Sequence, residues 1–150
     1  MNVVRLNHFL IRTEQLEKSR EFFEGVVGLH VGQRPPFRFP GYWMYSENGH
    51  PIVHLATPGG DQSEVARYLG AQRAGAGTGC LDHVAFMCAG LATFERRLKQ
   101  HGYDYFGRTV PDEGLHQLFV DGPDGIRFEF MFPQHEAASW IVDESGVAHT

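Results

Sequence analysis

Two short apolar runs in the chain begin in the same way, with a leucine, an Asn or Asp, and a histidine. The first is LNHFLI at residues 6–11 and the second is LDHVAF at residues 81–86. His8 and His83 are separated by 75 positions, and at that offset the helical spacing of apolar residues after each run also coincides. The pattern predicts a duplicated module in which a strand is followed by an amphipathic helix.

Each copy is predicted to contain one helix and four strands. Apolar residues at helical spacing mark the helices: Leu16, Phe23 and Val27 in the first copy, and Leu91, Phe94 and Leu98 in the second. Gly28 and Gly102 are the predicted helix ends. The strands are predicted at residues 3–12, 30–34, 41–46 and 51–56, and again at 81–88, 105–110, 115–120 and 126–132. This order of elements indicates an α+β fold.

We expect a single domain over residues 1–150, because a chain of this length buries one core. The modules would cover about residues 3–56 and 80–132, joined by a Gly-rich linker at 57–79. The linker holds a possible short helix, SEVARYLG. The tail at 133–150 holds SWIVDE, which would add an edge strand or pack on a neighbouring chain.

The alternation of side chains along a strand sorts each predicted strand into two faces. In RFEFMF the phenylalanines at 128, 130 and 132 would pack under the helices, which turns Glu129 to the opposite, concave face. The same alternation sends His8, His54 and His83 to that face. One sheet hollow could therefore collect three imidazoles and one carboxylate.

The hairpin LFVDGPDGIRF extends this prediction to substrate-contacting residues. If Val120 pairs with Ile126, Gln117 and Phe119 line the hollow, and the repeat offset places Tyr42 and Met44 there in the first copy. A one-residue slip would present His116 instead. Arg127 shares the face of Glu129, where it would form either a structural ion pair or a substrate contact.

Composition narrows the possible partners. A net charge of -5 without Lys or Arg clusters is unsuited to nucleic acid or anionic membranes. No apolar run approaches the roughly 20 residues that a membrane span requires, and the N-terminus lacks the pattern of a signal peptide. We therefore expect a soluble, cytoplasmic protein that acts on a small molecule. Two cysteines without CxxC spacing indicate neither disulfides nor a cysteine zinc site.

The four polar residues of the concave face indicate a metal site. Buried imidazole and carboxylate groups need partners, and one divalent cation satisfies all four. Nitrogen and oxygen ligands of this kind suit Fe(II), Ni, Mn, Co or Zn. Each histidine taken alone could instead be structural, and His54 could lie behind the ligands rather than among them.

The sequence resembles the vicinal oxygen chelate superfamily, which includes glyoxalase I, methylmalonyl-CoA epimerase, extradiol dioxygenases and the bleomycin resistance proteins. The resemblance covers about residues 3–132. It rests on NHFLI with EFFEGVVGL, on DHVAF and on FVDGPDGIRFEF. It implies tandem βαβββ modules forming a curled mixed sheet around a metal cleft, with ligands at His8, His54, His83 and Glu129. It also implies a homodimer, with each cleft built from one chain or from two.

Two positions depart from the family pattern. His54 stands where many isomerase members have Glu or Gln, and Gly122 stands where the turn usually begins with Asp. Four ligands would leave an octahedral ion two positions, which suits a glyoxalase-like lyase or isomerase. The predicted catalytic groups are Glu129 and His54, the latter as an acid or base if it does not ligate. If His54 does not ligate, three positions suit an Fe(II) extradiol-type ring-cleaving dioxygenase. A third alternative is a non-catalytic small-molecule binding protein of the drug-resistance type. The predicted substrate-binding residues are Tyr42, Gln117, Phe119 and Arg127.

Overall fold

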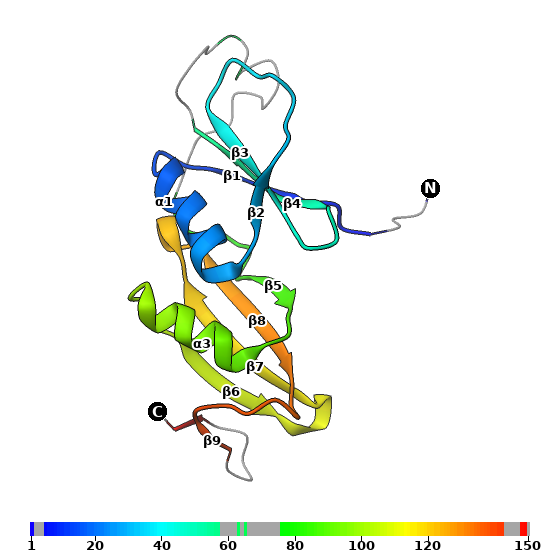
Figure 1. Cartoon of the computed structure of the whole chain (residues 1–150), viewed down its shortest axis with the longest axis vertical. Coiled ribbons are helices and arrows are strands. Elements are labelled where there is room, and N and C mark those ends of the chain that lie inside the picture. Colours follow the sequence, from blue (N-terminus) through cyan, green and yellow to red (C-terminus); the bar gives the residue numbers. More distant parts are fainter. Residues whose placement is uncertain (2–4, 58–62, 64, 66–75, 143–147, 150) are drawn as a thin grey trace. The chain divides into compact units, whose positions relative to one another are not determined.

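The computed structural model of the chain describes residues 1, 5–57, 63, 65, 76–142 and 148–149, and it divides into two compact units, Met1–Gly75 and Ala76–Thr150. Figure 1 shows that each unit contains a four-stranded sheet and a helix. The boundary falls inside the predicted linker. The predicted linker helix lies almost entirely outside the described residues, and the single-domain expectation stays a prediction.

The first unit follows the predicted order of strand, helix and three strands. Its elements are β1 (Phe9–Arg12), α1 (Leu16–Glu21), the π-helix η1 (Phe22–Val27), β2 (His30–Gly32), β3 (Gly41–Tyr45) and β4 (Pro51–Ala56). The sheet order is β1-β4-β3-β2, in which β1 and β4 are parallel and the other pairs are antiparallel. Gly28, with φ of 87°, ends the helical segment as predicted.

The second unit repeats this plan. Its main elements are β5 (Val84–Met87), α3 (Leu91–Gln100), β6 (Phe106–Val110), η2 (Pro111–Glu113), β7 (Leu115–Asp121), η3 (Pro123–Gly125) and β8 (Arg127–Pro133). The order β5-β8-β7-β6 again contains one parallel pair, β5 with β8. The α+β fold of two tandem βαβββ modules is therefore confirmed.

The parallel pairs reproduce the repeat residue by residue. Leu10 lies opposite His54 in the first unit, and Ala85 lies opposite Glu129 in the second. The offset between the copies is thus kept on both strands of each pair. This register fixes which side chains of β1, β4, β5 and β8 lie away from the helices.

Each helix covers one face of its own sheet. In the first unit Phe22, Phe23 and Val26 are buried together with Met44, Val53 and Leu55. In the second, Phe94 of α3 packs on Phe130 and Phe132 of β8, with ring centroids 4.5 and 5.6 Å apart. Burying a phenylalanine of this kind contributes roughly 1.5–3 kcal/mol. His54 of β4 and Glu129 of β8 lie on the faces away from the helices.

The tail does not add the edge strand predicted for it, and its packing on a neighbouring chain stays a prediction. β9 (Ile141–Val142) pairs with β10 (Ala148–His149) in a separate two-stranded sheet and does not extend the main one. Trp140 anchors the segment, because its indole lies against Gly107, where an added Cβ would meet the ring at 2.8 Å. Among the described residues no helix is long and apolar enough to cross a membrane.

Candidate functional site

In the first unit the two predicted histidine ligands lie together. His54 alternates along β4 with the buried Val53 and Leu55, so its ring lies on the face away from α1. His8, just before β1, stacks on this ring with centroids 3.9 Å apart. Trp43, opposite His54 on β3, stacks on it at 4.1 Å with an interplanar angle of 4°. Two rings at these distances occupy opposite faces of the imidazole, so His54 is held between them.

The environment of His54 favours its neutral form. Burial, aided by the neighbouring His8, lowers the pKa of His54 to about 4, against a backbone hydrogen bond at Pro51 that raises it. Within the part of the chain that the structure describes, its Nε2 is buried and has no hydrogen-bond partner. The hydrogen bond to the backbone at Pro51 must therefore involve the other ring nitrogen, Nδ1. A neutral imidazole whose second nitrogen is held by the backbone and whose Nε2 is unpaired fits the requirements of a metal ligand.

The other two predicted ligands meet in the second unit. Glu129 of β8 is only 6% exposed, and its Oε2 lies 2.8 Å from Nε2 of His83. The hydrogen bond that His83 donates to Asp82 raises the pKa of His83, and burial works against this increase while Glu129 adds to it. The imidazole and carboxylate share a proton that a cation could replace. Their chemistry thus fits a divalent metal.

The residue before each histidine orients its ring. Nδ1 of His8 lies 2.7 Å from Oδ1 of Asn7, and Nδ1 of His83 lies 2.7 Å from Oδ1 of Asp82. Because each Oδ1 can only accept, each Nδ1 carries a proton, so Nε2 is the ring nitrogen at which a cation can bind or replace a proton. This explains the repeated Asn or Asp before His. The repeated Asn or Asp is visible in the sequence, but its role as a hydrogen-bond partner of the histidine ring is visible only in the structure.

Gln117 and Phe119 lie on the face of Glu129, as predicted, although the hairpin register differs. Val120 pairs with Phe128 and not with Ile126, a shift of two residues that preserves the faces. Phe119 lies directly opposite Glu129, and its ring meets His83 edge-on with centroids 5.7 Å apart. Gln117 is buried and accepts a hydrogen bond of 2.6 Å from Nε of Arg108.

The predicted orientation of Tyr42 and Met44 is wrong. Tyr42 lies opposite the buried Leu55, and its hydroxyl donates to Glu17 of α1 at 2.6 Å, while Met44 is fully buried. Both therefore lie on the helix side. Trp43 lies opposite His54 in the same way that Phe119 lies opposite Glu129. The structural equivalent of Phe119 in β3 is therefore Trp43, one residue away from the position that the constant offset of the repeat predicts. Since strand side chains alternate, that single residue reverses every face.

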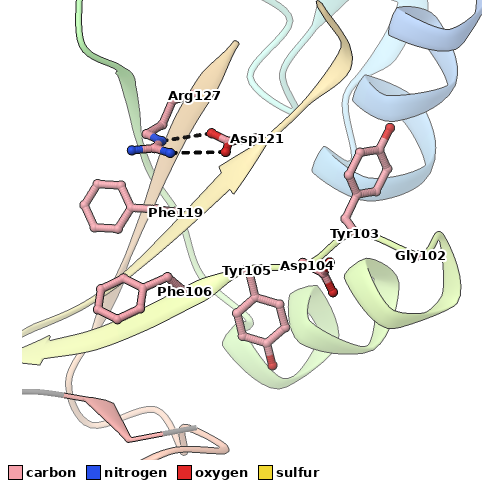
Figure 2. A pocket seen from close by; sticks show the side chains of 8 residues that line it. All are labelled: Gly102, Tyr103, Asp104, Tyr105, Phe106, Phe119, Asp121 and Arg127. Carbon is pink, nitrogen blue, oxygen red and sulfur yellow. Dashed lines mark hydrogen bonds and ion pairs between the residues drawn. The ribbon is translucent and has the colours of Figure 1, made fainter. Parts of the chain in front are cut away.

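Arg127 forms an ion pair on the rim of the second unit. Its Nε and Nη2 donate to Asp121 at 2.8 and 3.1 Å. Of the two roles predicted for Arg127, an ion pair and a substrate contact, these bonds match the ion pair. The pair borders a cavity of about 670 Å³ that is shown in Figure 2. Its lining consists of Gly102, Tyr103, Asp104, Tyr105, Phe106, Phe119, Asp121 and Arg127. Phe119 is the residue that links this cavity to the His83 and Glu129 pair, because its ring lines the cavity and also meets His83 edge-on.

His116 belongs to the core, as the hairpin register requires. It is 3% exposed, and its ring nitrogens lie 2.8 Å from Oγ1 of Thr109 and 3.0 Å from the carbonyl of Glu136. Among the described residues no group of three or more His, Cys, Asp and Glu side chains is assembled for a metal. Each unit contributes one pair, and the four-ligand set stays a prediction.

Comparison with known proteins agrees with this architecture. Residues 5–130 match the family model of the Glyoxalase/Bleomycin resistance protein/Dioxygenase superfamily. Glyoxylase I 4 of Arabidopsis thaliana is 26% identical over 134 residues, which cover 86% of this chain and 71% of that protein. The mitochondrial methylmalonyl-CoA epimerase of Bos taurus is 35% identical over 75 residues, which cover 49% of this chain and 43% of that protein.

The fold is also found in a solved structure of an antibiotic-binding protein. The crystal structure of TnmS3 from Streptomyces sp. CB03234 superposes with a TM-score of 0.59 at 15% identity, covering 89% of this chain and 98% of that one. This likeness concerns the fold alone. Together with the family match over residues 5–130, the two βαβββ modules show that the chain belongs to the glyoxalase/bleomycin resistance protein/dioxygenase superfamily.

Proposed function

We propose that this protein is a metal-dependent enzyme that chelates two adjacent oxygens of a small organic substrate. The ligands are His8 and His54 from the first unit and His83 and Glu129 from the second. Their nitrogen and oxygen atoms suit Fe(II), Ni, Mn, Co or Zn. Such an ion supplies Lewis acidity and a fixed geometry for the substrate oxygens.

The observation that carries this proposal is the state of His54. Its Nε2 is buried without a hydrogen-bond partner in the described part of the chain, and its low pKa keeps the ring neutral. An unpaired buried nitrogen costs roughly 1–3 kcal/mol, which a structural histidine would avoid. A ligand role accounts for that cost. The pairing of His83 with Glu129 at 2.8 Å provides the second half of the donor set.

Glyoxalase-like lyase or isomerase chemistry is the reaction we favour. Four ligands leave room for a bidentate substrate and nothing more, and two relatives carry the names of a glyoxylase and an epimerase. In such a reaction a carbon beside a chelated oxygen loses a proton. Oε of Glu129 would accept it, whereas His54 would hold a proton only if its Nε2 does not bind the metal. Gln117 and Phe119 line the same face, where they orient the substrate.

The second candidate is an Fe(II) extradiol-type dioxygenase. The stacking of His54 between His8 and Trp43 supports it, because a ring held on both faces can act as an acid or base without ligating. We also propose a homodimer in the cytoplasm. The exposed Leu10 and Met87 on the edge strands β1 and β5 support the dimer, since a neighbouring chain would cover them.

Metal content is the decisive measurement. The untagged chain is purified without chelator, and elemental analysis compares wild type with His54→Ala and His83→Ala. His50→Ala serves as the matched control, because His50 is an exposed loop residue. We expect about one transition metal per chain in wild type and in the control, and loss of metal in His83→Ala.

Assays of the loaded protein then separate the reactions. Consumption of the adduct of a dicarbonyl and a thiol supports the glyoxalase-like reaction. Oxygen uptake with Fe(II) and a catechol, together with metal retained in His54→Ala, supports the dioxygenase. A wild-type chain that stays empty after reconstitution with Fe, Ni, Zn and Mn, and that binds a hydrophobic compound without turnover, would show a binding protein instead.

A further inference from the structure

Two phenylalanines on the second sheet stand on the face of Glu129 and not on the helix side. Phe106 of β6 lies opposite Phe119 of β7, which lies opposite Glu129 of β8. The two rings have centroids 6.4 Å apart, and Phe106 is 47% exposed. Leaving half of a phenylalanine in water forgoes part of the stabilisation that burial provides. We call this pair the aromatic platform.

Charged groups frame the platform but largely cancel one another. The guanidinium of Arg108 lies 5.3 Å from the centre of the Phe119 ring and is held there by Gln117. On the other side, Figure 2 shows Arg127 and Asp121 joined beside the Phe119 ring. Asp104 is a further acid of the lining, opposite in sign to Arg108. The frame therefore offers no unbalanced charge that would select an ionic ligand.

The platform is continuous with the proposed metal ligands. His83 meets Phe119 edge-on at 5.7 Å, and Phe119 stands opposite Glu129. A molecule whose oxygens bind a metal held by these two residues would extend a substituent first over Phe119 and then over Phe106. The cavity of about 670 Å³ that Phe119 and Phe106 help to line is within the usual range of small-molecule sites, about 300–1,000 Å³.

We infer that the aromatic platform of Phe106 and Phe119 binds a neutral, planar aryl arm of the chelated substrate. The inference rests on the proposed function, which it deepens by naming the substrate class: vicinal-oxygen compounds that carry an aryl group. Flat aromatic surfaces stack with offset or edge-on geometry, and the tilt of 33° between the two rings offers both.

The aromatic pocket of the first unit is the weaker candidate. Its cavity, about 210 Å³, includes Phe37, Phe39 and Trp43. Phe37 and Phe39 already stack on each other at 5.0 Å, and the guanidinium of Arg34 covers both. Phe39 is buried and Trp43 stacks on His54. These rings are covered by one another and by Arg34, whereas Phe106 leaves 47% of its surface exposed.

Two hydroxamates test the inference, because both chelate through adjacent oxygens and differ only in their arm. Acetohydroxamate and 2-naphthohydroxamate are titrated calorimetrically into the full chain loaded with Ni²⁺. We expect the naphthyl compound to bind about tenfold more tightly to wild type. Phe106→Ala should weaken it by about fivefold and leave acetohydroxamate unchanged, and Phe106→Tyr should restore tight binding. Phe37→Ala is the matched control and should have no effect.

The outcomes separate the two proposals. Equal affinity of the two hydroxamates, or a loss in Phe37→Ala instead of Phe106→Ala, would overturn the aryl platform while leaving metal chelation intact. If neither compound binds in a metal-dependent way, the proposed function fails. The platform is then judged by saturation-transfer NMR with 2-naphthamide and the metal-free chain. Transfer that is lost in Phe106→Ala supports it, and absence of transfer refutes it.

Discussion

The hydrogen bond between Asp82 and His83 is expected to control how tightly the site holds a metal. It joins Oδ1 to Nδ1 over 2.7 Å and so leaves Nε2 for Glu129 and the metal. In Asp82→Ala the ring can adopt the other tautomer and rotate. Loss of such a partner typically lowers metal affinity about 10–100-fold. Because the Asp82 side chain is 83% exposed, water already competes for the bond, and we expect the lower end, about tenfold.

The chain contains its own control for this prediction. At His8 the same bond is made by the amide of Asn7, so an acceptor oxygen is sufficient and a charge is not required. Asp82→Asn should therefore lose less than about threefold. Asp112→Ala, which removes an exposed acid of η2, controls for net charge. Affinities are measured by competition with a chromogenic chelator. Equal losses in the Ala and Asn variants would show that charge matters, and no loss in either would refute the orienting role.

Three further predictions concern residues outside the proposed ligand set. Glu136→Ala removes the carboxylate that accepts the first N–H groups of α3 at 2.6–3.1 Å, and should lower the free energy of unfolding in urea by about 1–2 kcal/mol. Tyr42→Phe should leave metal content unchanged and cost less than about 1 kcal/mol, because the lost partner is an exposed carboxylate; loss of metal would contradict its helix-side position. Burial raises the pKa of Cys88 to about 12, so at about pH 8 only the exposed Cys80 should react with a thiol reagent, and two reacting thiols in the folded chain would contradict this.

The repeat is the part of the structure that the sequence predicted best. Local periodicity assigned the helices and strands of both copies, and Gly28 and Gly102 have the positive φ that suits a helix end. The faces of β4 and β8 followed as well. Val53 and Leu55 alternate with His54, and an apolar residue on each side of a polar one is enough to decide which face is buried.

Register between strands was harder, because it depends on how many residues separate them. The hairpin prediction was displaced by two residues, which left Gln117 and Phe119 on the expected face. In β3 the displacement from the copied pattern is one residue, and it exchanged Tyr42 for Trp43. The residue types did not distinguish Tyr42 from Trp43, because both are aromatic and both can be half-buried. Only pairing with His54 decided between them.

Contacts between distant residues could not be read from the sequence at all. The carboxylate of Glu136 caps a helix 45 positions earlier, and Trp140 fills the space above Gly107. The sequence by itself determined a duplicated βαβββ plan and which strand faces are polar, because those follow from periodicity along the chain. The tertiary structure decided the partner of each ring, the unpaired nitrogen of His54 and the exposed Phe106, because burial and hydrogen bonding depend on what neighbouring strands bring within reach.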